Sequence, residues 1–200
     1  MSTPSAAIDF DAEPGRVVAF AATTSDLVLA YGGALALHLS RGDRVVCVVV
    51  CDEDDAALRS GDEALARLGR PEVRRLGLAA ASDVRRGGLG GVHDLVARVG
   101  AVLDTVVGRI DALGTEPFAI FAAAPPADDA EPRDQDRRAL AAALAAAMST
   151  LARGQRPLRV FGEPWAQRRF ELDAGALEAK RAALALRGTS VGEFPPAACV

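Results

Sequence analysis

The sequence predicts a doubly wound α/β fold, in which helices cover both faces of a mostly parallel sheet. Short β-branched runs alternate with helical patterns along the whole chain. The run at 44–51 (RVVCVVVC) is almost wholly apolar, which is typical of a central parallel strand that is covered on both faces. The 200 residues are enough for one domain with its own core. We therefore expect a single domain at 16–200, preceded by a flexible segment at 1–15.

The part of the chain up to residue 78 is expected to form alternating strands and helices. The β-branched run RVVAFAA predicts the first strand, and the turn Arg41-Gly42-Asp43 ends the first helix. Gly69 and Pro71 end the second helix, because glycine favours the helix C-terminus and proline cannot continue the helix. The expected strands are 16–22, 44–51 and 73–78, and the expected helices are 31–40 and 55–68.

The rest of the chain continues the alternation. A long helix is expected at 92–113, where apolar residues recur at helical spacing. The run FAIFAAA predicts a strand at 118–124, and an Ala-rich helix follows at 134–153. A last strand and helix are expected at 158–162 and 174–187, with loops at 79–91 and 125–133.

Charge and cysteine usage exclude several protein classes. The net charge of −4 and the pI near 5.3 argue against a nucleic-acid or anionic-membrane partner, which would need a basic surface. The N-terminus is not patterned as a signal peptide, and no apolar run is long enough to cross a bilayer. We expect a cytoplasmic protein that binds a small molecule, either as a homo-oligomer or with a partner protein.

The three cysteines, Cys47, Cys51 and Cys199, do not predict a disulfide framework or a metal site. Cys47 and Cys51 are expected to be buried small apolar residues in a reducing compartment. Their even spacing in the strand at 44–51 predicts that they lie on the same face.

Ligands of doubly wound sheets bind beyond the carboxyl ends of the strands. This rule selects the connections at 23–26, 52–55, 125–136 and 163–169. In the second of them, the acidic run 52–55 is expected mainly to cap the next helix, with Asp52 directed toward the site. In the fourth, Glu163 and Trp165 follow the last strand, and Trp165 is a candidate wall for a ligand or a core residue.

The segment 17–54 resembles the opening of the PIG-L/LmbE family of zinc-dependent de-N-acetylases. That family has a strand, a His-Pro-Asp-Asp-Glu motif, a Gly-Gly pair on a helix, and a Gly-x-x-Val turn into a second strand. Gly32-Gly33 and the turn at 41–45 fix the register. Further similar segments are Leu68-Gly69, Leu76-Gly77-Leu78, RDQDRRAL at 133–140 and EAKRAAL at 178–184. The resemblance implies a Rossmann-like, LmbE-like fold over most of the chain.

The resemblance also implies that most of the zinc site has been replaced. In the family, the histidine and second aspartate of the first motif bind zinc with a later histidine, and the first aspartate is the general base. By register, Thr23, Thr24, Ser25, Asp26 and Leu27 occupy the first motif, so only Asp26 is a retained ligand. We therefore expect no metal and no cofactor.

The second motif departs from the family as well. Arg137 stands at the ligating histidine, Asp136 is retained before it, and Asp134 takes the place of a histidine that helps with the oxyanion in some members. We hypothesise that an ion pair between Arg137 and Asp26 takes over part of the electrostatic role of the metal. The candidate catalytic residues are Asp26, Asp136 and Arg137. The candidate ligand-binding residues are Thr23, Thr24, Ser25, Asp52, Asp134 and Trp165.

Three functions stay open. The first is a repurposed, metal-independent enzyme acting on a small polar metabolite in bacterial specialised metabolism. The Arg- and Ala-rich composition indicates a high-GC, actinobacterial type of genome and does not bear on the function. The second is a non-catalytic ligand-binding module or partner subunit. The third is a zinc N-deacetylase with recruited ligands such as His93 or Asp52, if the Gly87–Gly91 loop reaches the site. His38 is expected to be structural.

Overall fold

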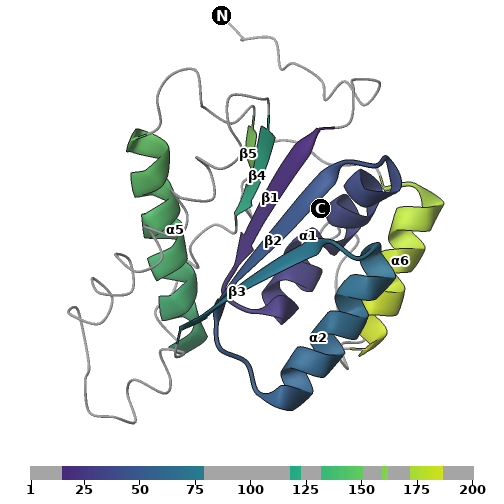
Figure 1. Cartoon of the computed structure of the whole chain (residues 1–200), viewed down its shortest axis with the longest axis horizontal. Helices are drawn as coiled ribbons and strands as arrows, with labels where there is room; N and C mark the ends of the chain where they lie inside the picture. Colours follow the sequence, from purple (N-terminus) through teal and green to yellow (C-terminus); the bar gives the residue numbers. More distant parts are fainter. Residues whose placement is uncertain (1–14, 79–117, 123–131, 151–158, 162–171, 187–200) are drawn as a thin grey trace, which may run out of the picture.

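The computed structural model describes residues 15–78, 118–122, 132–150, 159–161 and 172–186. Its centre is a five-stranded sheet in the order β3-β2-β1-β4-β5, and all neighbouring strands are parallel (Figure 1). The strands are β1 (Arg16–Ala21), β2 (Arg44–Cys51), β3 (Glu72–Leu78), β4 (Phe118–Ala122) and β5 (Arg159–Phe161). The chain starts in the middle of the sheet, winds outward to β3, and then continues on the other side of β1.

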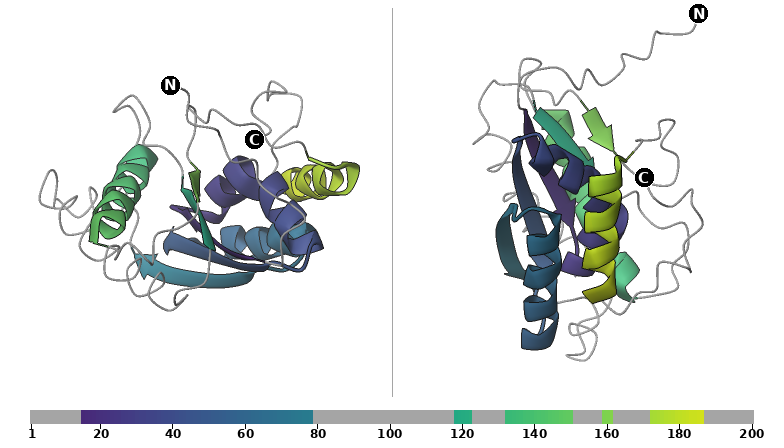
Figure 2. Two further views of the ribbon diagram at one scale, coloured as in Figure 1. Left: turned by 90° about the horizontal axis from the view of Figure 1, so that it is seen from above. Right: turned by 90° about the vertical axis from the view of Figure 1, so that its right-hand side faces the viewer.

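Helices cover both faces of the sheet (Figure 2). One face carries α1 (Thr24–Ser40), α2 (Asp55–Leu68) and α6 (Ala174–Leu186), and α5 (Pro132–Thr150) lies on the other. The doubly wound α/β fold expected from the sequence is thus confirmed. No helix in the described ranges is both long enough and apolar enough to cross a membrane.

The alternation of side chains along β1 builds a separate core on each face. Val18 and Phe20 pack with Leu140 and Leu144 of α5. Their neighbours Val17, Ala19 and Ala21 face the helices α1, α2 and α6. Because β1 is buried on both faces from Val17 to Ala21, it needs apolar residues at these five positions, and its sequence RVVAFA has them after Arg16.

Cys47 and Cys51 belong to different cores, so the prediction that they share a face is wrong. Cys47 lies in the core toward α1, and Cys51 lies in the core toward α5 with Val48 and Val50. The pairing of β2 with β3 shifts register between Val49 and Cys51. The extra residue lies on β3, which advances three residues from Arg75 to Leu78 while β2 advances two. Within β2, Val50 and Cys51 pack into the same core, so the alternation of faces ends at the last residue of the strand.

The Gly-Gly pair lets α1 approach α6 closely. A Cβ on Gly33 would clash with the side chain of Leu172, two residues before α6, whereas one on Gly32 would meet Lys180 of α6 and Leu68 at 3.5 Å or more. The pair that fixed the register of the resemblance therefore lies at a helix–helix contact.

The expected bounds of β2 and α2 are confirmed, and β1 and β3 each differ from the expected bounds by one residue. The expected end of β4 at 124 and the expected ends of β5 at 158 and 162 lie outside the described residues. The helix expected at 31–40 starts seven residues earlier, at Thr24, because Thr23 caps it. The helix expected from residue 134 starts at Pro132, since proline fits the first position of a helix. The loop at 79–91 and the helix at 92–113 lie outside the described residues.

Candidate functional site

Polar side chains from three connections gather at the carboxyl ends of β1 and β2. The ends of these strands are adjacent, since the N–H of Cys51 donates to the carbonyl of Ala22 at 2.9 Å. The connection from β1 to α1 supplies Thr23, Thr24 and Asp26, the one from β2 to α2 supplies Glu53, and the first part of α5 supplies Arg137. We call these five residues the edge cluster.

The first turn of α1 is a capping box made by Thr23 and Asp26. The hydroxyl of Thr23 accepts a hydrogen bond from the N–H of Asp26 at 3.2 Å, and the carboxylate of Asp26 accepts one from the N–H of Thr23 at 3.2 Å. These bonds satisfy donors that the helix itself leaves unpaired. The next residue, Leu27, is fully buried in the core, so the position of the motif's glutamate is apolar here.

Arg137 forms an ion pair with Asp26, which is 111 residues away in the chain. Nη2 of the guanidinium donates to Oδ1 of Asp26, while Oδ2 of the same carboxylate belongs to the capping box. The side chain of Arg137 is 27% exposed and that of Asp26 is 14% exposed, so the pair is partly accessible to solvent. The contact hypothesised between these residues is therefore present, and the neighbouring Asp136 is buried.

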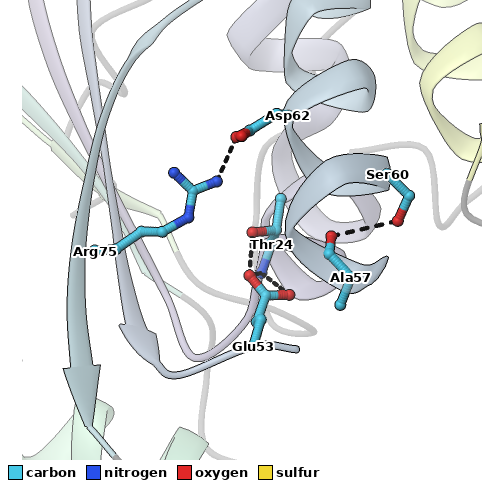
Figure 3. A network of polar contacts seen from close by, with 6 residues as sticks. All are labelled: Thr24, Glu53, Ala57, Ser60, Asp62 and Arg75. Carbon is cyan, nitrogen blue, oxygen red and sulfur yellow. Dashed lines mark hydrogen bonds and ion pairs between the residues drawn. The ribbon is translucent and has the colours of Figure 1, made fainter. Parts of the chain in front are cut away.

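Glu53 reaches the edge cluster, although the sequence singled out Asp52 instead. The carboxylate of Glu53 accepts hydrogen bonds from the hydroxyl and the N–H of Thr24 (Figure 3). Asp52 is exposed, and its carboxylate accepts from the N–H of Glu53 at 3.1 Å. Asp54 caps α2, as expected, by accepting from the N–H of Ala57 at 2.8 Å. The sequence signal for Glu53 is its place two residues beyond the end of β2, but the capping role expected of the acidic run 52–55 obscured it.

Some of the other candidates lie within the described residues and some lie outside them. Ser25 lies in the same turn and is half-buried. Asp134 belongs to α5, but its side chain lies outside the described residues, as do His93, Trp165, Glu163 and the Gly87–Gly91 loop. His38 is buried at the end of α1 remote from the edge cluster, and its Nδ1 contacts the carboxylate of Asp43.

The side chains described here do not fit the catalytic zinc centre of the family that the sequence resembles. Catalytic zinc sites use three protein ligands from His, carboxylate or thiolate, with one open position. The edge cluster offers two carboxylates, of which Asp26 contacts a guanidinium and Glu53 contacts Thr24. Within the described ranges, no three His, Cys, Asp or Glu side chains are grouped so that they would hold a metal ion.

No protein-family model and no curated protein matches the sequence, but solved structures do. A deacetylase of the teicoplanin biosynthesis pathway matches with a TM-score of 0.63 and 19% identity, over 86% of this chain and 83% of that chain. N,N'-diacetylchitobiose deacetylase from Pyrococcus horikoshii matches with a TM-score of 0.58 and 14% identity, over 90% and 71%.

A third match is GalB, the 4-carboxy-2-hydroxymuconate hydratase from Pseudomonas putida KT2440, with a TM-score of 0.54 and 17% identity, over 90% of this chain and 80% of that chain. At these identities the matches establish the fold. The chain has the fold of the LmbE/PIG-L deacetylases, as the sequence resemblance implied.

Proposed function

We propose that this LmbE-like protein is a repurposed enzyme that acts without zinc on a small polar metabolite at the carboxyl edge of β1 and β2. Arg137 would replace the metal as the fixed cation of the site. Asp26 or Asp136 would serve as the acid–base group, and Thr23, Thr24 and Ser25 would line the site. A place in bacterial specialised metabolism is supported by the match to a deacetylase of teicoplanin biosynthesis.

The observation that carries the proposal is the ion pair between Arg137 and Asp26. By register, Asp26 is the retained zinc ligand and Arg137 stands at a ligating histidine. A guanidinium stays charged at any physiological pH and binds carboxylate or polarised oxygen atoms through a planar set of donors. Such a cation stabilises negative charge that develops on a substrate oxygen, which is one of the roles of a catalytic zinc ion.

The fold itself accommodates chemistry other than deacetylation. One of the matching structures is a hydratase, and the others described above are deacetylases. A fold shared by both does not fix the reaction, so the reaction has to be argued from the site. This supports a changed activity and leaves the substrate to be identified.

A second candidate function is a non-catalytic binding module or partner subunit. It is favoured because polar groups of the edge cluster form hydrogen bonds and an ion pair with one another. Asp26 contacts Arg137 and Thr23, and Glu53 contacts Thr24. Polar groups that are paired with each other can stabilise a scaffold without taking part in chemistry.

Zinc titration of the full chain after EDTA treatment tests the proposal. The double variant Thr23→His/Arg137→His restores the two histidines beside Asp26, and Thr23→His/Arg138→His is the matched control. We expect calorimetry to show a one-to-one zinc site only in the first variant, with an affinity at least 100-fold above that of the wild type. A one-to-one site in the wild type that is lost in Asp26→Ala would contradict the proposal. If it is lost in His93→Ala instead, the recruited-ligand deacetylase is the correct alternative.

Mass spectrometry separates the enzyme from the binding module. A bacterial metabolite extract is incubated with the EDTA-treated wild type or with Arg137→Ala. An enzyme is expected to deplete one compound and produce another, and the variant should not do so. A compound that copurifies with the wild type and is not converted would favour the binding module.

A further inference from the structure

Glu53 holds the first residue of α1 from a different connection of the sheet. We infer that Glu53 is a positioning residue: it fixes the first turn of α1 so that Asp26 keeps the geometry in which it pairs with Arg137. The inference rests on the proposed function only in that this ion pair is the centre of the proposed site. The contacts themselves do not depend on which reaction takes place there.

Both hydrogen-bond donors of Thr24, its N–H and its hydroxyl, are directed to the carboxylate of Glu53. The N–H of Thr24 lies 3.3 Å from each carboxylate oxygen, and the hydroxyl donates to Oε2. Thr24 has no exposed surface, so this hydroxyl needs a partner within the protein. A carboxylate at this place is also favoured by the positive end of the α1 helix dipole.

Thr24 is confined on its other side by α2. A Cβ on Gly61 would lie 2.9 Å from Cγ2 of Thr24 and 3.1 Å from its Cβ, so the two helices meet with no spare room at this point. Glu53 and Gly61 together therefore hold Thr24 against the middle of α2. A β-branched side chain packed in this way has one available rotamer.

The position of Asp26 depends on the turn that Thr24 begins. The carboxylate of Asp26 accepts from the N–H of Thr23, and its own N–H donates to the Thr23 hydroxyl. If the first turn frays, both bonds are lost and Oδ1 leaves the place where it meets Arg137. Glu53 therefore acts on the ion pair through Thr24 and the capping box.

Arginine NMR on the full-length protein tests the inference. The Nη resonances of Arg137, assigned by their loss in Arg137→Lys, report whether the guanidinium is held in an ion pair. Amide hydrogen exchange at residues 24–27 reports the first turn of α1. The variants are Glu53→Ala and Glu53→Gln, in which the amide oxygen still accepts from Thr24. The matched control is Asp62→Asn, which removes the ion pair of the neighbouring carboxylate with Arg75.

We expect Glu53→Ala to speed exchange at residues 24–27 at least tenfold and to average the Arg137 Nη signals, and Glu53→Gln to restore most of both. Asp62→Asn should leave both unchanged. Unchanged Arg137 signals in Glu53→Ala, or an equal effect of Asp62→Asn, would overturn the inference. If Glu53→Ala does not fold, Thr24→Val is used in its place, because it removes the hydroxyl that donates to Glu53. Faster exchange and averaged Arg137 signals in Thr24→Val would then support the inference, and unchanged Arg137 signals would overturn it. Since none of these readouts uses zinc or substrate, they fail or succeed independently of the proposed function.

Discussion

At the scale of single residues, Asp26 has two separable contacts. One oxygen accepts from the N–H of Thr23 in the capping box, and the other pairs with Arg137. Asp26→Asn keeps an oxygen for the cap and removes the charge. We expect it to lower the free energy of unfolding by about 0.5–1 kcal/mol, since the pair is partly exposed. Asp26→Ala also loses the cap, for a total of about 2 kcal/mol.

Urea denaturation measures both variants. Asp54→Ala, which removes the cap of α2 and no contact to Arg137, should cost about 1 kcal/mol and is the control for capping alone. In a double-mutant cycle, Asp26→Asn and Arg137→Ala should couple, whereas Asp54→Ala and Arg137→Ala should add. Equal losses in Asp26→Asn and Asp26→Ala would show that the ion pair and the cap are not separate contacts.

Cys47 gives a pH-dependent contribution to stability. Burial raises the pKa of its thiol from 9.0 to about 12. Between these values the unfolded chain releases the thiol proton and the folded chain retains it, so the stability due to this group falls as the pH rises. Below pH 9.0 the contribution is fully present.

The stability difference between the wild type and Cys47→Ala checks this contribution. We expect the difference to shrink from pH 8 to pH 10.5, with a limiting slope of about 1.4 kcal/mol per pH unit above pH 9. The other titrating groups cancel in the comparison. A difference that stays constant over this range would mean that the Cys47 thiol ionises equally in both states.

At the scale of elements, the contact between α1 and α2 depends on Gly61. Alanine is favoured over glycine in helices by about 1 kcal/mol, so Gly61→Ala would stabilise an open position. Here the added Cβ would lie 2.9 Å from Thr24, which Glu53 holds in place. We expect Gly61→Ala to destabilise the protein by about 1–3 kcal/mol, as overpacking does.

Gly32→Ala is the matched control, because its Cβ would meet Lys180 and Leu68 at ordinary contact distances of 3.5–3.7 Å. It should be neutral or stabilising by up to about 1 kcal/mol in thermal and urea denaturation. Thr24→Ser removes Cγ2 and keeps the hydroxyl, and it should recover part of the loss in Gly61→Ala. If Gly61→Ala is as stable as Gly32→Ala, the first residue of α1 is not confined by α2.

The sequence was sufficient for elements whose signals are local. The apolar run of β2 and the stop at Gly69 predicted the bounds of β2 and α2 correctly. The early start of α1 does not follow from the motif comparison, which treats Thr23 as a replaced ligand and Asp26 as a retained one and takes no account of their capping pattern. The face of Cys51 was missed because a register shift in a sheet depends on the partner strand.

The contacts of the edge cluster could also be predicted only in part from the sequence. The register of the resemblance placed Arg137 and Asp26 together, since both positions correspond to ligands of one metal ion. The contact between Glu53 and Thr24 joins two connections whose relative position follows only from the packing of α1 on α2. Neither residue type nor spacing along the chain indicates such a contact.

At the scale of the whole molecule, the parallel sheet brings together side chains from three connections that are far apart in the sequence. β1 is central, its neighbours β2 and β4 are parallel to it, and their following segments supply Glu53 and Arg137. The central claim is that Arg137 occupies, through its pair with Asp26, the place that the family gives to zinc. This claim concerns one position in the folded chain, so a direct structural measurement can test it.

That measurement is a crystal structure of the full chain grown with excess zinc, with anomalous data collected at the zinc absorption edge. We expect Arg137 Nη2 to stay paired with Asp26 and no anomalous peak to lie between Thr23, Asp26 and Arg137. A zinc ion bound by Asp26, with the Arg137 side chain turned outward, would contradict it.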